Sequence, residues 1–341
     1  MTAALDTQAP VLQISDLTLG FDTPRGRAQV LEGVNFNLFP GEILALVGET
    51  GSGKSVTAKS ILNLIPHSRP RGEIRFLDRD LLTLAPKALG QIRGREISMV
   101  FQNPQSSINP VFTLGEQLRR LIRLYLPGEV KQRARQDQCS PRAAQETIAR
   151  EKLQEVGLTD ARRLLALYPW QISGGMAQRY RIALALLSSP RVLIADEATS
   201  ALDVTVQAHI LNLLKTLCRE KQTAILFITH DLGIAAQICR RVAVMYAGRI
   251  VESGPTRELF ANPGHPYTQG LLRAVPTLGS PKPLSFIPGK IPDLVHPPQG
   301  CRFSSRCPGV RAECRRAKPR DIQVGPDHWV ACVQCIPRRQ P

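Results

Sequence analysis

Long apolar runs are absent from this chain. The longest uninterrupted run, residues 182–187, has six residues, whereas a membrane-spanning helix needs roughly 20. The first six residues also lack a basic region followed by an apolar core, so we expect no secretion signal. The sequence therefore predicts a soluble, cytoplasmic chain, and 341 residues are enough for two or more compact units.

Aromatic residues are also scarce, at 5%, while the net charge is +16. Such a basic excess suits nucleic acid, the anionic inner face of a membrane, or an arginine-rich surface facing water. Few aromatics leave no platform on which bases could stack, which disfavours nucleic acid as a partner. The membrane face and the solvated surface both stay open.

One glycine-rich segment, residues 48–55, fits the pattern G-x-x-x-x-G-K-[ST] of a phosphate-binding loop. We predict a strand over residues 43–47 before it and a helix over residues 55–64 after it. Glycines let backbone N–H groups approach phosphate oxygens, and the helix N-terminus adds positive charge. A plain glycine-rich turn is the alternative, which the flanking strand and helix disfavour.

The loop residues assigned to ATP binding are Gly48, Glu49, Thr50, Gly51, Ser52, Gly53, Lys54 and Ser55. The assignment ends at Ser55. A threonine at position 56 would offer a further hydroxyl, but that position is a valine, Val56. We therefore add no ATP-binding residue beyond Ser55.

A second segment, residues 172–179, is followed one helix length later by the apolar run 192–195 and by Asp196 and Glu197. The run predicts a strand buried on both faces. Ligands of open parallel sheets bind beyond the carboxyl ends of the strands. We therefore expect Asp196 near a magnesium ion and Glu197 beside an attacking water molecule.

In this order the motifs resemble those of the ATP-binding subunits of ABC transporters, over residues 12–332. A kinase would have no use for the Ser-Gly-Gly signature at 173–175, and relatives in DNA repair or translation usually carry coiled-coil insertions or two ATPase halves. The resemblance implies roles for Phe21 (adenine stacking), Gln102 (Q-loop), Ser173, Gly174, Gly175 and Met176 (signature, for a partner's ATP), Asp203 (D-loop) and His230 (switch histidine).

The resemblance also implies a hydrolytic mechanism. Lys54 would bridge the β- and γ-phosphates, and Ser55, Gln102 and Asp196 would surround Mg²⁺. Glu197 would be the general base, although a free carboxylate with a pKa of about 4.3 must gain strength from its position or from a desolvated site. His230 would orient the water.

Several segments resemble bacterial dipeptide, oligopeptide and nickel importers, so peptides and nickel or other metal chelates both stay open as cargo. Met176 replaces the glutamine that closes the common signature, as in one of the two ATPase subunits of such importers; it could also simply pack. The implied partners are a second ATPase subunit in a heterodimer, two membrane permeases and a solute-binding protein, with no nucleic acid. The implied location is peripheral, on the cytoplasmic face of the inner membrane.

The predicted fold class is α/β, a RecA-like P-loop NTPase core with an antiparallel β edge and an inserted α-helical subdomain. We assign residues 10–101 and 184–260 to the nucleotide-binding core and residues 102–183 to the helical subdomain with the signature. Residues 261–341 are predicted to be a proline-rich, irregular linker and a cysteine-rich C-terminal extension.

Five of the eight cysteines lie in the last 41 residues. Cys301, Cys307, Cys314 and Cys332 follow the spacing C-x5-C-x6-C-x17-C, which is not the C-x2-C pairing of a zinc ribbon. The spacing resembles the tails of the peptide-importer ATPases, some of which are thought to hold a 4Fe–4S cluster. Four thiolates suit such a cluster and also zinc, and free thiols are the third possibility. Cys335 could replace Cys332.

Because this tail is far in sequence from every ATP motif, we expect a structural or assembly role for it. His265 and His296 are predicted to be surface or turn residues. Trp329 is predicted to cover the cysteine cluster, and Cys218 and Cys239 are predicted to be core residues.

Overall fold

A computed structural model describes residues 9–102, 108–199, 202–275 and 286–335. The chain divides into two compact units. The first combines Met1–Leu84 with Leu226–Pro341, and the second is Ala85–Ile225. In the described segments no helix combines the length and the apolar character that a bilayer crossing requires.

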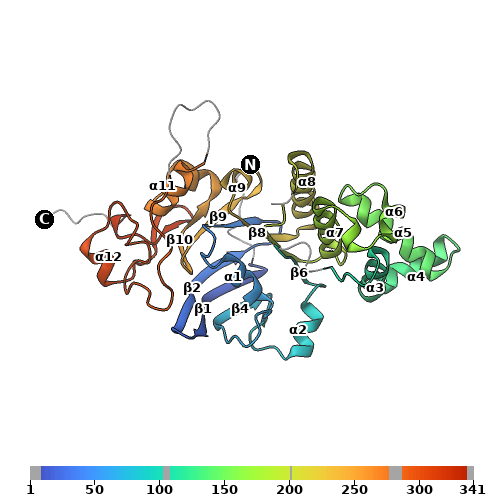
Figure 1. Cartoon of the computed structure of the whole chain (residues 1–341), viewed down its shortest axis with the longest axis horizontal. Helices are drawn as coiled ribbons and strands as arrows, with labels where there is room; N and C mark the ends of the chain where they lie inside the picture. The colour runs from blue at the N-terminus through green and yellow to red at the C-terminus, as the bar shows by residue number, and fades with distance from the viewer. Residues whose placement is uncertain (1–8, 103–107, 200–201, 276–285, 336–341) are drawn as a thin grey trace. The chain divides into compact units, whose positions relative to one another are not determined.

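The first unit contains an antiparallel sheet with strand order β2-β1-β4-β5 (Figure 1). Its strands are β1 (Leu12–Thr23), β2 (Gly26–Leu38), β4 (Arg71–Phe76) and β5 (Arg79–Asp80). Side chains of β1 such as Leu12, Ile14 and Leu19 are buried, while the polar residues that alternate with them are half-buried or exposed, as expected for a sheet with one face on the core.

A second set of strands in this unit runs in the order β11-β12-β10-β9-β3-β8. The members are β3 (Ile43–Val47), β8 (Ala224–Thr229), β9 (Arg241–Tyr246), β10 (Arg249–Pro255), β11 (Ile322–Gly325) and β12 (His328–Val330). Strand β3 is parallel to β9, whereas β10 is antiparallel to β9 and β12. Every residue of β3 and β8 is buried, which explains their continuous apolar sequences.

The tail is more regular than the sequence predicted. Strand β12 pairs with β10 through Glu252↔Val330 and Ser253↔Trp329, so part of the tail extends a sheet. The proline-rich stretch also contains a helix, α11 (Pro266–Arg273), with His265 as its N-cap. The prediction of an irregular linker is wrong there, because proline in the first turn of a helix costs no hydrogen bond and its fixed φ suits the helix.

The other helices of the first unit are short: α1 (Lys54–Ile61), α9 (Leu232–Ile238), α10 (Thr256–Ala261) and α12 (Ala312–Arg316). Helix α1 begins one residue before the predicted start and ends three residues before the predicted end at Leu64. Cys239, at the end of α9, is buried, as predicted.

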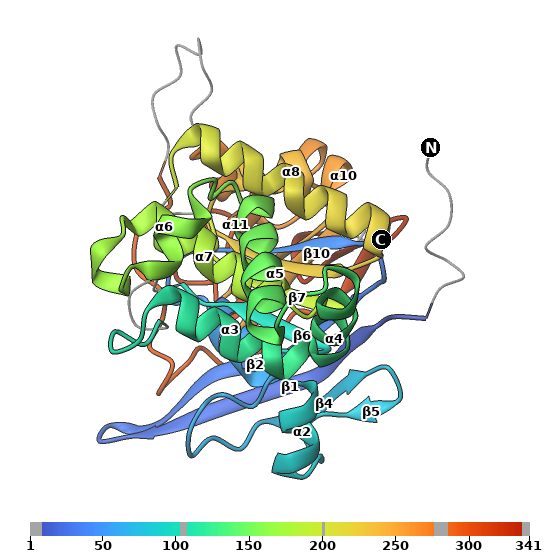
Figure 2. The same cartoon turned by 90° about the vertical axis from the view of Figure 1, so that its right-hand side faces the viewer.

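In the described part of the second unit, the strands β6 (Ile97–Val100) and β7 (Val192–Asp196) pair in parallel, and most of the remaining regular structure is helical (Figure 2). Its helices are α2 (Pro86–Ile92), α3 (Leu114–Tyr125), α4 (Pro127–Gln136), α5 (Pro141–Glu155), α6 (Ala161–Ala166), α7 (Gly174–Leu186) and α8 (Val204–Lys221). Helix α3 buries Leu114, Leu118 and Ile122, which lie four residues apart and therefore on one face.

Helix α3 also begins as its sequence dictates. Thr113 accepts a hydrogen bond from the backbone of Glu116, and the Glu116 side chain accepts one from the backbone of Thr113. This reciprocal cap satisfies two backbone donors that a helix start leaves unpaired.

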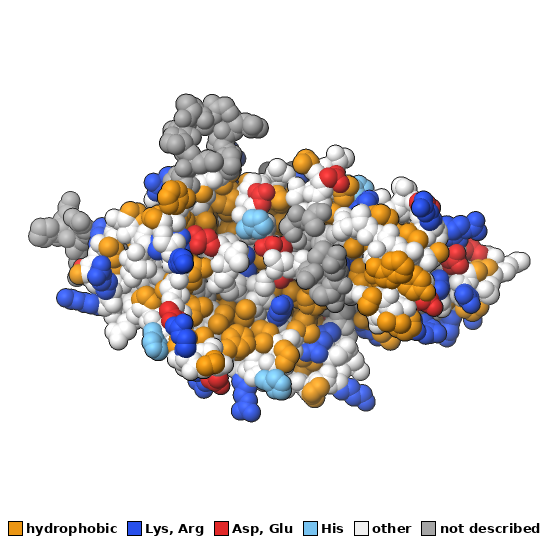
Figure 3. All heavy atoms as spheres, viewed as in Figure 1, with side chains coloured by type: hydrophobic (Ala, Val, Ile, Leu, Met, Phe, Trp, Pro, Cys, Tyr) orange, Lys and Arg blue, Asp and Glu red, His pale blue; other side chains and the backbone are white. Residues whose placement is uncertain are grey.

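On the face drawn in Figure 3, the Lys and Arg side chains form several separate groups.

Candidate functional site

The glycine-rich loop connects β3 to α1 in the first unit. Gly48, Gly51 and Gly53 have φ angles of 152°, 84° and 109°, in the region that glycine alone adopts without strain. A Cβ atom on Gly48 would lie 2.2 Å from the carbonyl oxygen of Met245. Glycine at position 48 is therefore required by close contact with β9 as well as by its backbone conformation.

Lys54 is buried inside this loop. Its Nζ donates hydrogen bonds to the carbonyl oxygens of Gly48, at 2.7 Å, and of Glu49, at 2.9 Å. Ser55 follows it in the first turn of α1. An ammonium group, a hydroxyl and the start of a helix, gathered in one loop, are the groups that phosphate oxygens bind.

The residue after Ser55 adds no polar group to the loop. Position 56 is not a threonine; Val56 is half-buried in α1 and has an apolar side chain. Its carbonyl oxygen accepts a hydrogen bond from Ser60 Oγ at 2.8 Å, within the helix. The hydroxyl that a threonine would supply is therefore missing, and the candidate phosphate-binding side chains end at Ser55.

Glu49 is held by residues from the far end of the chain. Its backbone N donates to Tyr267 Oη at 2.8 Å. Its carboxylate accepts from both terminal nitrogens of Arg306, at 2.8 and 3.1 Å. The fold thus brings the tail, which is far from the ATP motifs in sequence, into direct contact with the glycine-rich loop. The sequence does not reveal the roles of Tyr267 and Arg306, since no local pattern indicates such a long-range contact.

The groups around Glu49 are shielded from water, and this shifts their acidity. Burial raises the pKa of Tyr267 and of Tyr246. Burial works to lower the pKa of Arg306, but its hydrogen bonds to Glu49 and Tyr246 outweigh this, so its pKa lies above the usual value. The guanidinium is therefore charged at any physiological pH.

His265 was predicted to lie on the surface, and this is wrong. The side chain is buried, its Nδ1 accepts a hydrogen bond from the backbone N of Tyr267 at 3.0 Å, and its ring centroid lies 5.7 Å from that of Phe303. Burial lowers the pKa of His265 to about 3. It is a neutral core residue, whereas the segment around His296 is irregular, as predicted.

The proposed adenine-stacking residue, Phe21, is half-buried and pairs with Ala28 across the β1–β2 hairpin. The tail also supports this hairpin. Gln29 N donates to the carbonyl oxygen of Leu294 at 2.7 Å, and Arg25 forms an ion pair with Asp293. His230 directly follows β8 and is exposed.

In the second unit, Asp196 ends β7 and is buried. The next residue, Glu197, has a φ angle of 48° and accepts a hydrogen bond at its Oε2 from Gln102 Nε2 at 2.8 Å. Strands β6 and β7 are parallel and in register from Ile97↔Val192 to Val100↔Ala195, so their carboxyl ends meet at one edge. That register brings Gln102 to Glu197 across 95 residues of sequence.

Two further polar residues of α7, Gln178 and Arg181, connect these loops. Arg181 donates to Gln178 Oε1 at 2.8 Å and to the carbonyl oxygen of Phe101. Gln178 donates to the carbonyl oxygen of Ala198. Burial lowers the pKa of Arg181 to about 10. The sequence prediction gave them no role, although polar residues in a largely apolar helix were the available signal.

The signature residues form the start of α7. Ser173 Oγ accepts from the backbone N of Met176 at 3.2 Å, and Gly174 is exposed. Similarly, Asp203 caps α8 by accepting from Val206 N at 2.9 Å. The exposed start of a 13-residue helix is suited to an anion from another molecule. Two predicted segments, 103–107 of the Q-loop and 200–201 of the D-loop, lie outside the described residues.

The tail cysteines influence one another without forming a metal site. Cys301 N donates to the carbonyl oxygen of Cys314 at 2.7 Å. Burial raises the pKa of Cys301, with the charges of Cys314 and Cys307 adding to the effect, and burial raises the pKa of Cys332 to about 11. Among the described residues, which include all four cysteines, no group of three or more His, Cys, Asp or Glu is placed to hold a metal ion. The 4Fe–4S prediction therefore has no support from this arrangement.

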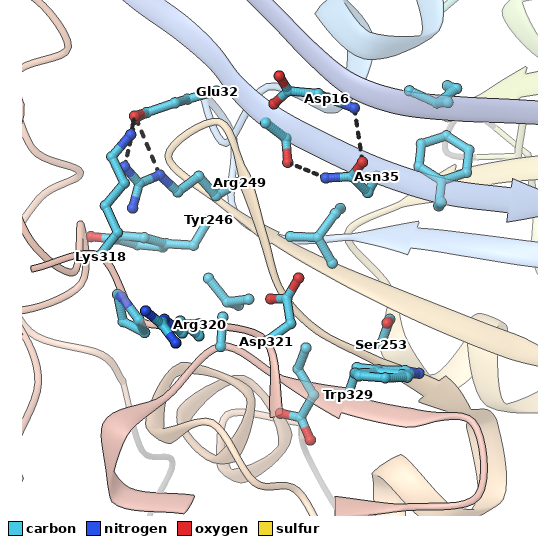
Figure 4. Close-up of a pocket in the computed structure, with 18 of the residues that line it drawn as sticks. Asp16, Glu32, Asn35, Tyr246, Arg249, Ser253, Lys318, Arg320, Asp321 and Trp329 are labelled. Carbon is cyan, nitrogen blue, oxygen red and sulfur yellow. Dashed lines mark hydrogen bonds and ion pairs between the residues drawn. The ribbon is translucent and has the colours of Figure 1, made fainter. Parts of the chain in front are cut away.

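A cavity of about 970 Å³ lies in the first unit between the hairpin strands, β10 and the tail (Figure 4). At its wall Glu32 meets Arg249 at 2.7 Å, Arg302 at 2.5 Å, and Lys318. Trp329, predicted to cover the cysteines, is 42% exposed and lines this cavity together with Cys301. The lining contains no residue of the glycine-rich loop.

Comparisons with known proteins agree with this geometry. Residues 31–200 match the ABC transporter family, and residues 251–314 match the C-terminal region of oligopeptide/dipeptide transporters. The chain is 43% identical to the dipeptide transport ATP-binding protein DppD of Bacillus subtilis (strain 168), covering 94% of each chain. It is 44% identical to the oligopeptide transport ATP-binding protein OppD of the same strain, covering 94% of this chain and 87% of the relative.

A solved structure is also similar: the dimeric post-hydrolysis state of an ATP-binding cassette bound to ADP and Pi. It has a TM-score of 0.63 and 28% sequence identity, and the match covers 72% of this chain and 99% of that one. The fold and the loop define an ATP-binding cassette of the P-loop class, so the predicted mixed α/β cassette fold is confirmed. The chain belongs to the ATP-binding subunits of ABC transporters, in the family of oligopeptide and dipeptide transporters. Hydrolysis of ATP coupled to transport is the activity of this family, and it is the activity of this chain.

Proposed function

We propose that this chain hydrolyses ATP to power the import of peptides, with Glu197 as its general base. The observation that carries the proposal is the hydrogen bond between Gln102 and Glu197 at the edge where Asp196 ends β7. In the proposed site the loop 48–55 binds the phosphates and Phe21 stacks on adenine. We keep the assignment of residues 10–101 and 184–260 as core, 102–183 as helical subdomain and 261–341 as linker and extension.

The polar groups of the proposed site then divide the work of binding and hydrolysis among them. Lys54 contacts the β- and γ-phosphates, and Glu197 accepts a proton from the attacking water while Gln102 and His230 orient it. Ser55, Gln102 and Asp196 would hold Mg²⁺, which neutralises charge on the transferred phosphoryl group. These oxygen donors are the ligand type that Mg²⁺ prefers.

The site is completed by a second subunit. The exposed start of α7, with Ser173, Gly174, Gly175 and Met176, would contact the γ-phosphate on the partner's loop, and Asp203 would lie at the same interface. The dimeric form of the similar solved structure supports this arrangement. We propose a heterodimer with a second ATPase subunit, two membrane permeases and a solute-binding protein, at the cytoplasmic face of the inner membrane.

Peptides are the proposed cargo because the two relatives named above are dipeptide and oligopeptide transport proteins. The match of residues 251–314 to a peptide-transporter region supports the same conclusion. This subunit need not touch the cargo, so the choice among peptides belongs to its partners.

We also propose that Cys301, Cys307, Cys314 and Cys332 hold a metal centre, a 4Fe–4S cluster or zinc. Their spacing, which resembles that in the tails of the peptide-importer ATPases, supports this. The side chains as placed do not form a ligand set, so ligation would require them to move. No step of ATP hydrolysis is assigned to this centre.

The test is transport-coupled hydrolysis. The chain is co-expressed with its neighbouring ATPase, permease and binding-protein genes, and ATPase activity is measured in proteoliposomes with and without di- to pentapeptides. We expect peptides to stimulate hydrolysis in the wild type, and Lys54→Ala to lose ATP binding. Stimulation by metal chelates but by no peptide would reject the proposed cargo.

A further inference from the structure

We propose that Arg306, in the C-terminal tail, is a positioning residue of the ATP site that acts through Glu49. The inference rests on the proposed role of residues 48–55 as the phosphate loop. Arg306 lies next to Cys307 and is 257 residues from Glu49 in sequence.

The contact between the two residues is directional. Arg306 Nη1 lies 2.8 Å from Glu49 Oε2, and Nη2 lies 3.1 Å from Oε1. A two-point contact between guanidinium and carboxylate fixes orientation as well as distance. The Arg306 side chain is only 4% exposed, so water competes little for this pair.

Arg306 is itself held in place by the tail and by β9. Its Nε donates to the carbonyl oxygen of Pro288 at 2.8 Å, and its Nη2 donates to that of Ile287 at 3.0 Å. Its Nη1 also lies 3.4 Å from Tyr246 Oη. With its donors committed on several sides, the guanidinium cannot follow Glu49 if the loop moves, so the loop is anchored to a fixed point.

The peptide group of Glu49 is anchored at the same time. Its N–H donates to Tyr267 at 2.8 Å, and its carbonyl oxygen accepts from Lys54 at 2.9 Å and from the backbone N of Ser52 at 3.1 Å. The side-chain contact with Arg306 is the fourth restraint on one residue. Restraining Glu49 sets the course of the loop that follows it, where the amides for phosphate binding lie.

Charge gives the pair a second effect. A carboxylate in a loop that binds ATP repels the phosphates, and Arg306 neutralises it. Removal of Arg306 would leave a partly buried, unpaired carboxylate beside the nucleotide, the arrangement that costs most when one member of a pair is truncated. We therefore expect the loss of Arg306 to weaken ATP binding more than it slows hydrolysis.

Two other tail contacts lie along the same site. The carbonyl oxygen of Leu294 pairs with Gln29 in the hairpin that carries Phe21, and a Cβ on Gly51 would lie 3.5 Å from Ile291 Cδ1. The tail therefore supports both the adenine-side hairpin and the phosphate loop. A structural change in the segment around Cys307 should therefore alter the affinity for ATP by displacing Arg306.

The test compares four variants in the assembled transporter: Arg306→Gln, Glu49→Gln, the double variant, and Arg315→Gln as control. Arg315 is an exposed arginine of the same tail, so its variant makes the same charge change without touching the loop. We expect Arg306→Gln to raise KM for ATP about tenfold with kcat within about twofold. Glu49→Gln should have a smaller effect, and the double variant should resemble Glu49→Gln, since the pair acts as a unit.

Binding of a fluorescent ATP analogue to the full chain gives the second measurement, and thermal unfolding shows whether each variant folds. If Arg306→Gln does not fold, KM for ATP is compared between the double variant and Glu49→Gln, because the double variant leaves no unpaired charge. Equal KM values in these two variants would support the inference. Additive effects in the double variant, or a KM for Arg306→Gln equal to that of Arg315→Gln, would overturn the inference. Loss of ATP binding in Lys54→Ala separates the two proposals: if Lys54→Ala binds ATP normally, the phosphate-loop assignment itself fails.

Discussion

Gln102 donates a hydrogen bond to Glu197 over 2.8 Å, from the end of one parallel strand to the end of the next. The amide of Gln102 can orient the carboxylate without removing its charge. Glu197 also sits in a left-handed backbone conformation, with φ of 48°, which non-glycine residues adopt at a cost that functional sites often bear.

Glu197→Gln should preserve ATP binding and stop turnover, because the amide keeps the shape and removes the base. We expect steady-state hydrolysis to fall by roughly 100-fold or more, in the range that loss of a general base gives. The ATP-bound dimer should accumulate and be visible by gel filtration. The partner's equivalent glutamate must be changed in parallel, and near wild-type turnover in that complex would show that Glu197 is not the base.

The purified chain alone should hydrolyse ATP slowly, since the proposed site needs a signature motif from a second protein. Addition of the cognate ATPase and permease subunits should raise the rate. Light scattering must establish that the starting sample is monomeric. A monomer that turns over as fast as the full complex would contradict the shared-site model.

Metal content decides the role of the tail cysteines. If Cys301, Cys307, Cys314 and Cys332 hold an iron–sulfur cluster, anaerobically purified protein should be brown, and Cys307→Ser should remove the iron. Cys218→Ser is a control, because that thiol is buried in α8, as predicted. Absence of both iron and zinc by elemental analysis of the anaerobic, full-length protein would leave free thiols.

Buried His265 should make the protein less stable in acid. Its pKa is about 3 in the folded chain, against about 6.5 when unfolded. Its contribution is therefore fully present above pH 6.5 and is lost as the pH falls towards 3, by at most about 1.4 kcal/mol per pH unit.

Urea unfolding at pH 7 and pH 5 measures this dependence. His265→Gln should show a smaller loss of stability between the two pH values than the wild type. His67→Gln, at an exposed position, should follow the wild type. Equal losses in the wild type and in His265→Gln would mean that another group is responsible.

Continuous apolar sequence was sufficient to predict several strands. The predicted bounds of β3 agree with the structure, and β7 extends one residue beyond the apolar run 192–195. Burial on both faces requires apolar residues at every position, so these strands can be read locally. The helix α11 and the tail strand β12 could not be predicted from local sequence. The high proline content around α11 suggested an irregular segment, and β12 is defined by its pairing with β10.

The sequence by itself indicated the proposed site: the glycine loop with Lys54, the carboxylates of Asp196 at the end of β7 and of Glu197 after it, and the signature at the start of α7. Those residues act through local backbone geometry, so their spacing along the chain is informative. Only the tertiary structure decided which distant groups contact them, namely Arg306 and Tyr267 on Glu49, and Arg181 and Gln178 on the segments that follow β6 and β7. Such contacts depend on the register of strands and the course of the tail. The sequence around a buried arginine or tyrosine does not indicate which distant residue it will contact.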